Sequence, residues 1–162
     1  MEFIWSPWRY QYVTSADKTP GCVFCRVLEE DDNEKNLEVH RAPLNFVILN
    51  RFPYTSGHLM IVPYKHESSL LGLDQATSTE MMELAKLSQK ALEAEYQPDG
   101  YNIGLNLGKC AGAGIAAHVH MHVVPRWTGD ANFVSVISET RILPEELSRS
   151  FEKLSKHFSS VT

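Results

Sequence analysis

Three histidines at alternate positions, His118, His120 and His122, constrain the fold of this chain more than any other feature. They lie in a run over residues 116–124 that has apolar residues between them and is closed by Pro125. Because side chains alternate between the two faces of a strand, the run predicts a strand with three imidazoles on one face and core residues on the other. Burying three imidazoles in a core would be unfavourable, since every imidazole has polar nitrogens that need hydrogen-bond partners. The pattern therefore predicts either a metal cluster or catalysis on an anion.

The rest of the chain alternates short apolar runs with two helical patterns. The apolar runs predict strands over 37–40, 44–50, 58–62 and 101–107. Apolar residues spaced three and four apart predict a long amphipathic helix over 74–96, and a last helix begins near Pro144. The acidic stretch 29–36 predicts a solvated loop. Together these elements predict an α+β fold with one antiparallel sheet, one long central helix and a C-terminal helix, the helices covering one face of the sheet.

Length and composition limit the class of protein. The 162 residues, 43% hydrophobic and 22% charged, are enough for a core, and we expect a single domain over 1–162. Segment 1–20 is rich in aromatic side chains, so we expect it to pack on that domain. A net charge of −5 disfavours nucleic acid as a partner. The absence of a leader pattern and of a membrane-length apolar run predicts a cytoplasmic protein without membrane contact.

A glycine-containing loop precedes the histidine run. Residues 106–114 read Asn-Leu-Gly-Lys-Cys-Ala-Gly-Ala-Gly. Glycines let a backbone approach a ligand closely and turn several N–H groups toward it, which suits phosphate oxygens. Many hairpins also contain glycines, so the loop alone is weak evidence. Next to the histidines it predicts a site that holds an anion beside a nucleophile.

The run His118-Val-His120-Met-His122-Val-Val resembles the signature of the histidine triad (HIT) proteins, which are nucleotidyl hydrolases and transferases. Four further segments extend the likeness over nearly the whole chain and resemble the bacterial diadenosine tetraphosphate phosphorylase/hydrolase branch. These segments are Trp5-Ser-Pro-Trp8-Arg9, Cys22-Val-Phe-Cys25, Gly57-His58-Leu-Met-Ile-Val-Pro63 and the tail from Pro125 to Phe133. The resemblance implies a HIT-like fold, an adenine nucleotide or dinucleoside polyphosphate as substrate, and a homodimer.

The resemblance also implies roles for the motif histidines. His120 would attack the α-phosphorus and form a covalent nucleotidyl-imidazole, which water or phosphate then resolves. His118 and His122 would flank the nucleophile, and His122 would contact the phosphate or the departing oxygen. The sequence leaves open whether water or phosphate is the acceptor, which base is preferred and how long the polyphosphate is.

The implied nucleotide-binding residues lie outside the histidine run. Backbone N–H groups near Gly112, Gly114 and Ile115 would stabilise charge on the phosphoryl oxygens. Asn50 would lie near the ribose and Asn106 near the phosphate, although either asparagine also fits a plain turn.

Ile115 departs from the pattern of the family. Many members carry Ser or Thr three residues before the first histidine, where a hydroxyl helps to protonate an amine-like leaving group. A polyphosphate needs far less protonation, so Ile115 favours dinucleoside polyphosphates over adenosine phosphoramidates. Two alternatives remain besides phosphoramidate hydrolysis. One is a nucleotide-binding sensor with incidental catalysis, and the other is a zinc-dependent hydrolase with the three histidines as ligands.

The Cys-x-x-Cys pair predicts metal or redox chemistry in a reducing compartment. By resemblance, a zinc site would combine four residues: Cys22, Cys25, His66 and His118. Two cysteines and two histidines suit tetrahedral Zn²⁺, and the ion would be structural because no position is left for water. The alternative is two free thiols without a metal.

Overall fold

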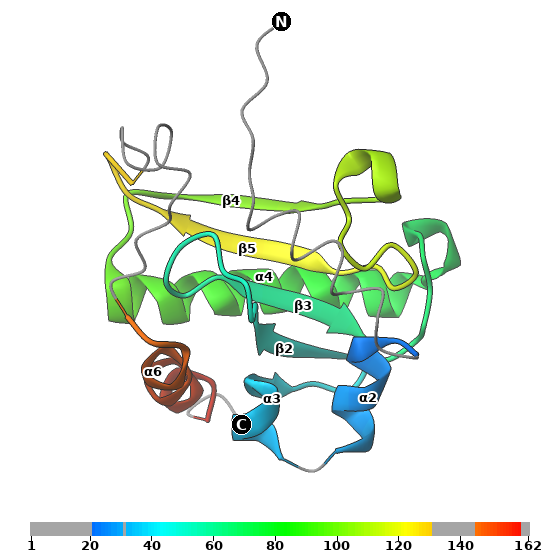
Figure 1. The fold of residues 1–162 in the computed structure, drawn as a ribbon, viewed down its shortest axis with the longest axis horizontal. Helices are drawn as coiled ribbons and strands as arrows, with labels where there is room; N and C mark the ends of the chain where they lie inside the picture. Colours follow the sequence, from blue (N-terminus) through cyan, green and yellow to red (C-terminus); the bar gives the residue numbers. More distant parts are fainter. Residues whose placement is uncertain (1–20, 31, 131–144, 160–162) are drawn as a thin grey trace, which may run out of the picture.

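The computed structural model describes residues 21–30, 32–130 and 145–159, and Figure 1 shows their arrangement. Five antiparallel strands form a sheet in the order β1-β2-β3-β5-β4. The strands are β1 (Glu38–Arg41), β2 (Asn45–Leu49), β3 (Leu59–Pro63), β4 (Gly100–Leu105) and β5 (Met121–Arg126). The predicted α+β fold with one antiparallel sheet is confirmed. The expected packing of segment 1–20 lies outside the described residues.

The long helix α4 (Gln75–Tyr96) packs along one face of the sheet (Figure 1). Asp74 caps its first turn, because its carboxylate accepts a hydrogen bond from the N–H of Thr77 at 2.8 Å. The helix ends at Gln97, which adopts the left-handed conformation at φ 47°. The predicted helix over 74–96 is therefore confirmed to within a residue. Its buried face and the wholly buried strands β2 and β3 form the centre of the core.

Within the described residues, three shorter α-helices flank the sheet: α2 (Val23–Glu29), α3 (Asn33–Asn36) and α6 (Leu147–Ser159). The prediction of a solvated loop over 29–36 is wrong in part, because Asn33–Asn36 form a helical turn with Asp32 accepting from the N–H of Lys35. Asn and Asp favour loops and helix caps alike, so composition could not separate the two. The predicted C-terminal helix is α6, which contacts β1 and α4.

The predicted strand over 116–124 is wrong at its start. β5 begins only at Met121 and continues past Pro125 to Arg126. Upstream, the carbonyl of Pro63 accepts from the His118 side chain at 2.9 Å, and the N–H of Val119 bonds to the carbonyl of Glu67. Side-chain and loop contacts thus take the place of the strand ladder around His118 and His120. Met121 and Val123, on the opposite face, are buried in the core as predicted.

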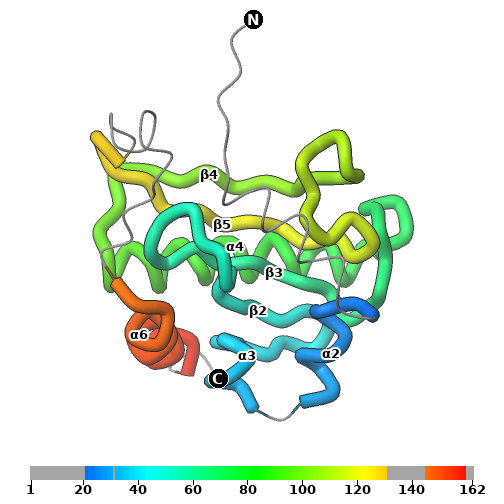
Figure 2. The backbone as a smooth tube through the Cα atoms, viewed as in Figure 1, coloured from blue at the N-terminus to red at the C-terminus, as the bar shows by residue number. Residues whose placement is uncertain are grey.

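The backbone tube shows that α2, the segment after β3 and the segment before β5 gather at one end of the sheet (Figure 2). Hydrogen-bond contacts join side chains from all three. None of the helices in the described part of the chain combines the length and apolar composition that a bilayer span requires.

Candidate active site and metal centre

His120 is a neutral imidazole, and a backbone carbonyl determines which of its two nitrogens carries the proton. Its Nδ1 lies 2.8 Å from the carbonyl oxygen of His118, and a carbonyl only accepts, so Nδ1 carries the proton. Nε2 therefore keeps its lone pair. The ring is 4% exposed, and this burial lowers the pKa of His120. Phe24 of α2 packs against it at 5.1 Å between ring centroids. A buried neutral imidazole with a fixed free nitrogen is suited to nucleophilic attack.

His122 is oriented by a second histidine, His58. The backbone N–H of Tyr54 donates to His58 Nδ1 at 3.1 Å, so the proton of that ring is on Nε2. His58 Nε2 lies 3.0 Å from His122 Nδ1 and donates to it. The proton of His122 is thereby placed on Nε2, which can donate a hydrogen bond. Burial and the neighbouring His120 lower the pKa of His122 to about 4, so the ring is neutral near pH 7.

The two rings form a pair with complementary roles. The centroids of His120 and His122 are 4.9 Å apart. One ring offers a lone pair and the other a hydrogen-bond donor, which is an arrangement suited to attack on a phosphate ester and to stabilisation of the oxygen that leaves. His58 is fully buried, and the sequence analysis assigned it no role. A histidine directly before the apolar run of β3 was the available signal, since a buried imidazole needs partners.

Asn50 lies at the end of β2 and joins this network. Its Oδ1 accepts from the N–H of Phe52 at 2.9 Å, and its Nδ2 lies 3.3 Å from His58 Nδ1. Both bonds stabilise the loop that carries His58. The structure thus places Asn50 next to His58. It also shows the role in a turn that the sequence had left open, because Asn50 Oδ1 accepts from the N–H of Phe52.

The glycine loop follows β4 beside the histidines. Gly112 is left-handed at φ 86° and ends the short helix η2 (Lys109–Ala111), with its N–H bonded to the Lys109 carbonyl at 3.0 Å. That N–H is therefore engaged within the loop. Ile115 packs against the core, and Gly114 is partly buried. Among the described residues neither has a backbone acceptor for its N–H, so these two amides remain the candidates for an anion.

Four predicted ligands come together in one cluster. The ligand atoms of Cys22, Cys25, His66 and His118 all lie within 4.8 Å of one another. His118 Nδ1 is 3.3 Å from Cys22 Sγ and 3.8 Å from Cys25 Sγ, and His66 Nδ1 is 3.3 Å from Cys25 Sγ. Bond lengths for tetrahedral zinc give ligand–ligand edges of about 3.3–3.8 Å. The cluster can hold a metal ion of this geometry.

The hydrogen bond of His118 supports the fit. Its Nε2 donates to the Pro63 carbonyl at 2.9 Å, so Nδ1 has no proton and faces the two thiols. A metal-ligating histidine ordinarily makes such a bond with its other nitrogen. The three motif histidines do not share one metal site in the described residues, because His118 bonds the Pro63 carbonyl through Nε2 and directs Nδ1 to the two thiols, away from His120 and His122. This argues against a zinc hydrolase with all three as ligands.

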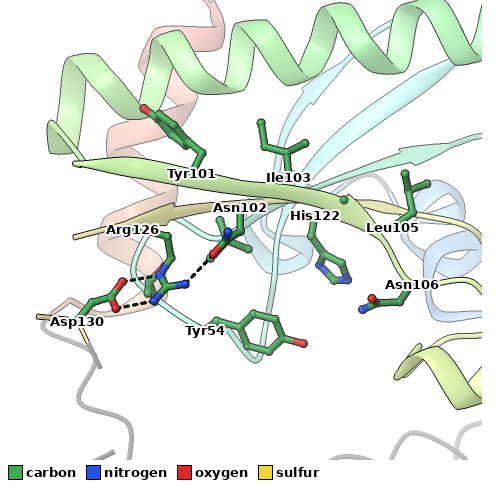
Figure 3. A pocket seen from close by; sticks show the side chains of 12 residues that line it. Tyr54, Tyr101, Asn102, Ile103, Leu105, Asn106, His122, Arg126 and Asp130 are labelled. Atoms are coloured by element: carbon green, nitrogen blue, oxygen red, sulfur yellow. Dashed lines mark hydrogen bonds and ion pairs between the residues drawn. The ribbon is translucent and has the colours of Figure 1, made fainter. Parts of the chain in front are cut away.

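A pocket of about 640 Å³ opens on the same face of the sheet, beside His122 (Figure 3). β4, β5 and the loop at Tyr54 form its walls. Figure 3 shows Asn102 and Asn106 on the His122 side of β4 and Tyr101 on the opposite side, toward α4. Asn106, predicted near the phosphate, therefore lies in one cavity with His122.

An antiparallel sheet that presents a buried imidazole with a free Nε2 beside a second imidazole that can donate through Nε2 is suited to histidine-based catalysis. The family model described as HIT domain matches residues 32–129, so this chain belongs to the HIT family. An AP-4-A phosphorylase of Mycobacterium tuberculosis is 37% identical over 155 residues, which cover 91% of this chain and 79% of that protein. The predicted resemblance to this branch is confirmed, and the chain is an enzyme of this family.

More distant relatives agree on the fold. An adenosine 5′-monophosphoramidase of Schizosaccharomyces pombe is 25% identical over 83% of this chain and 96% of its own length. A crystal structure of a Zn-bound histidine triad family protein from Mycobacterium smegmatis matches with a TM-score of 0.70 and 25% identity, over 87% of this chain and 95% of that one. A structure described as a hypothetical histidine triad nucleotide-binding protein from Sulfolobus tokodaii also matches with a TM-score of 0.70, at 23% identity over 86% of this chain and 93% of that one.

Proposed function

We propose that this enzyme cleaves diadenosine tetraphosphate at an α-phosphate through a covalent nucleotidyl intermediate on His120. The observation that carries the proposal is the His120 Nδ1 bond to the His118 carbonyl, which leaves Nε2 as the nucleophile. The 37% identity to an AP-4-A phosphorylase supports the choice of substrate. A nucleotide-binding sensor with incidental catalysis would not need an unprotonated nitrogen of His120 next to a hydrogen-bond donor fixed on His122.

The reaction follows from the protonation states of the two rings. The Nε2 lone pair of His120 forms a bond to the α-phosphorus, and the P–O bond to the polyphosphate breaks with its electron pair moving to oxygen. His122 Nε2–H donates a hydrogen bond to that oxygen, which leaves as a polyphosphate anion and needs no proton. Phosphate or water then attacks the phosphorus, the P–N bond breaks with its electrons returning to His120, and the proton of an attacking water passes to solvent. The amides near Gly114 and Ile115 stabilise the phosphoryl oxygens.

Product analysis tests this function and identifies the acceptor. We would incubate the protein with diadenosine tetraphosphate, with and without inorganic phosphate, and separate the nucleotides formed. ADP plus ATP indicates phosphorolysis, whereas AMP plus ATP indicates hydrolysis. Absence of cleavage under both conditions would overturn the proposal.

Ile115 distinguishes this function from phosphoramidate hydrolysis, for which the fission yeast relative is named. Its side chain packs against the core and offers no hydroxyl to a leaving amine. We expect a higher kcat/KM for diadenosine tetraphosphate than for adenosine phosphoramidate. Ile115→Ser should narrow the gap, because a positioned donor contributes about 10²–10⁴-fold. A wild-type preference for the phosphoramidate would contradict the proposed substrate.

We further propose that the four-residue cluster binds one structural zinc ion. Its geometry and the Zn-bound structure from Mycobacterium smegmatis support this assignment. The ion would link Cys22 and Cys25 of the N-terminal part to His66 and His118. Bound there, it would hold the segment before β5 in place and supply no bond to the substrate.

A homodimer remains part of this proposal. In the described sheet, β4 is an edge strand, and three of its six residues are exposed. An open edge offers unpaired backbone groups to a second chain. Sedimentation equilibrium would show twice the chain mass for a dimer, and a monomer at all concentrations would overturn it.

A further inference from the structure

The pocket beside His122 has no assigned role in the reaction described above. His122 lines one end of it, and the Tyr54 ring follows at 6.2 Å between centroids, inclined by 30°. Because His122 donates through Nε2, the oxygen that leaves the α-phosphorus lies next to this ring. Whatever is attached to that oxygen extends away from His120. The pocket is the space available on that side (Figure 3).

The side of β4 that faces His122 carries no bulky side chain at Asn102, Gly104 or Asn106, whereas Tyr101, Ile103 and Leu105 point the other way (Figure 3). Gly104 lies directly opposite His122 in the ladder, and Asn102 lies opposite Val124. A Cβ atom built on Gly104 would meet nothing within 4 Å, so the space above this glycine is open. A ligand can therefore approach the backbone of β4 beside His122. Asn106 continues the same face and adds a polar group near the reacting oxygen.

The far end of the pocket carries polar groups without a net charge. Arg126 makes two bonds to the carboxylate of Asp130, at 2.6 and 2.7 Å. Its Nη1 also donates to Asn102 Oδ1 at 2.6 Å. The guanidinium is thus neutralised by its partner and is not a free phosphate clamp. The bond to Oδ1 fixes the Asn102 amide, so that its Nδ2 donors point away from Arg126. Fixed amide donors beside an aromatic ring suit a nucleoside better than a phosphate.

We propose that this pocket binds the leaving half of the substrate, a nucleoside polyphosphate. This inference rests on the proposed function. The phosphates next to the scissile bond lie at His122 and Asn106, and the nucleoside lies between Tyr54, Asn102 and Arg126. In the first step the P–O bond breaks toward this pocket, and the departing oxygen meets the proton of His122. The pocket therefore distinguishes substrates by their leaving group.

Two substrates with the same adenylyl group test this assignment. Diadenosine tetraphosphate releases ATP, whereas adenosine 5′-phosphorofluoridate releases only fluoride. Gly104→Val fills the open space beside His122 with a side chain that strands accept readily. We expect kcat/KM for diadenosine tetraphosphate to fall about tenfold or more, and that for the phosphorofluoridate by less than about threefold.

The matched control is Gly100→Val. Gly100 lies on the same strand and face, its added Cβ also meets nothing within 4 Å, and it does not line the pocket. This variant should leave both rates unchanged. Melting temperatures establish that the variants fold, and Asn102→Leu, at an exposed position, provides a second test should Gly104→Val not fold. It should show the same selective loss.

The possible outcomes separate the two claims. Equal losses on both substrates, or no loss on either, would overturn the pocket assignment while leaving the proposed function in place. A wild-type protein inactive toward both substrates would overturn the proposed function itself. A wild type that cleaves only the phosphorofluoridate would overturn both.

Discussion

Hydrogen bonds give the three motif histidines different free nitrogens, although the sequence presents them as equivalent. His118 directs an unprotonated Nδ1 to two thiols. His120 keeps an unprotonated Nε2 for the substrate, whereas His122 carries its proton on Nε2. The carbonyl of His118 is also the acceptor for His120. One residue thus connects the metal cluster to the nucleophile, and His58 and the Tyr54 N–H set the state of the proton donor.

His58→Ala tests the role of this positioning residue. Without the donor at His122 Nδ1, the His122 proton can move to that nitrogen, and Nε2 no longer donates. We expect kcat to fall on the order of 10²-fold with a smaller change in KM. His58→Gln should restore part of kcat, because its amide can accept from Tyr54 and donate to His122. Equal kcat losses in both variants, or loss of structure by circular dichroism, would indicate a packing role only.

The lowered pKa of His122 predicts how stability depends on pH. An unfolded chain has an ordinary histidine pKa of about 6.5, whereas the folded value is about 4. Above pH ~6.5 both states are neutral and the full stability is present. As pH falls toward 4, the unfolded state binds a proton that the folded state does not, and the free energy of unfolding decreases. From pH ~7.5 to ~5, wild type should lose on the order of 1–2 kcal/mol more than His122→Asn in urea titrations. Identical losses would contradict this assignment.

At the scale of single residues, the sequence predicted which residues take part in the site better than it predicted the contacts they make. The alternating histidines and the Cys-x-x-Cys pair were recognisable as local patterns, and the structure brings the four predicted metal ligands together. His58 was missed because its role depends on a contact across 64 residues with His122. The engagement of Gly112 within its own loop is likewise a backbone geometry that composition does not specify.

Among the elements, α2 contributes both to the metal cluster and to the packing around the nucleophile. It begins between the two thiols, and its Phe24 packs on both His118 and His120. A metal in the cluster would join α2 to the segments around His66 and His118. The cluster therefore couples the N-terminal helix to the start of β5.

Removal of one thiol tests this coupling. We expect the purified protein to contain about one zinc ion per chain, and Cys25→Ser to lose the metal and several degrees of melting temperature together. Cys110→Ser is the matched control, because that thiol is exposed and lies outside the cluster. Atomic absorption and thermal unfolding provide the two readouts. A metal-free wild type with the melting temperature of Cys25→Ser would contradict the zinc assignment.

The elements themselves were predictable where a periodic pattern is long. The 22 residues of α4 carry several turns of apolar spacing, and both ends have cap signals. The start of β5 was not predictable, because alternation continues through residues that bond to Pro63 and Glu67 instead of a strand. Short helices such as α3 depend on a single cap and offer no period to detect.

Across the whole molecule, the metal cluster, the nucleophile and the pocket follow one another along β5 and the segment before it. His118 faces the cluster, His120 follows, and His122 and Arg126 line the pocket. α4 lies on the other face of the sheet and makes none of the described hydrogen bonds of His118, His120 and His122. Phe24 of α2, in contrast, is part of the core and packs on His118 and His120. Within β5, strand alternation separates the core residues Met121 and Val123 from His122, and the sequence predicted this part of the division.

The covalent intermediate on His120 is the central claim. We would mix wild type with diadenosine tetraphosphate, stop the reaction in alkali to preserve the acid-labile P–N bond, and map the modified residue by mass spectrometry. His120 should carry one adenylyl group, and His120→Ala should lose the adduct together with activity on the order of 10⁶-fold. An adenylyl group on another residue, or a His120→Ala variant that keeps a tenth of the activity, would contradict the account.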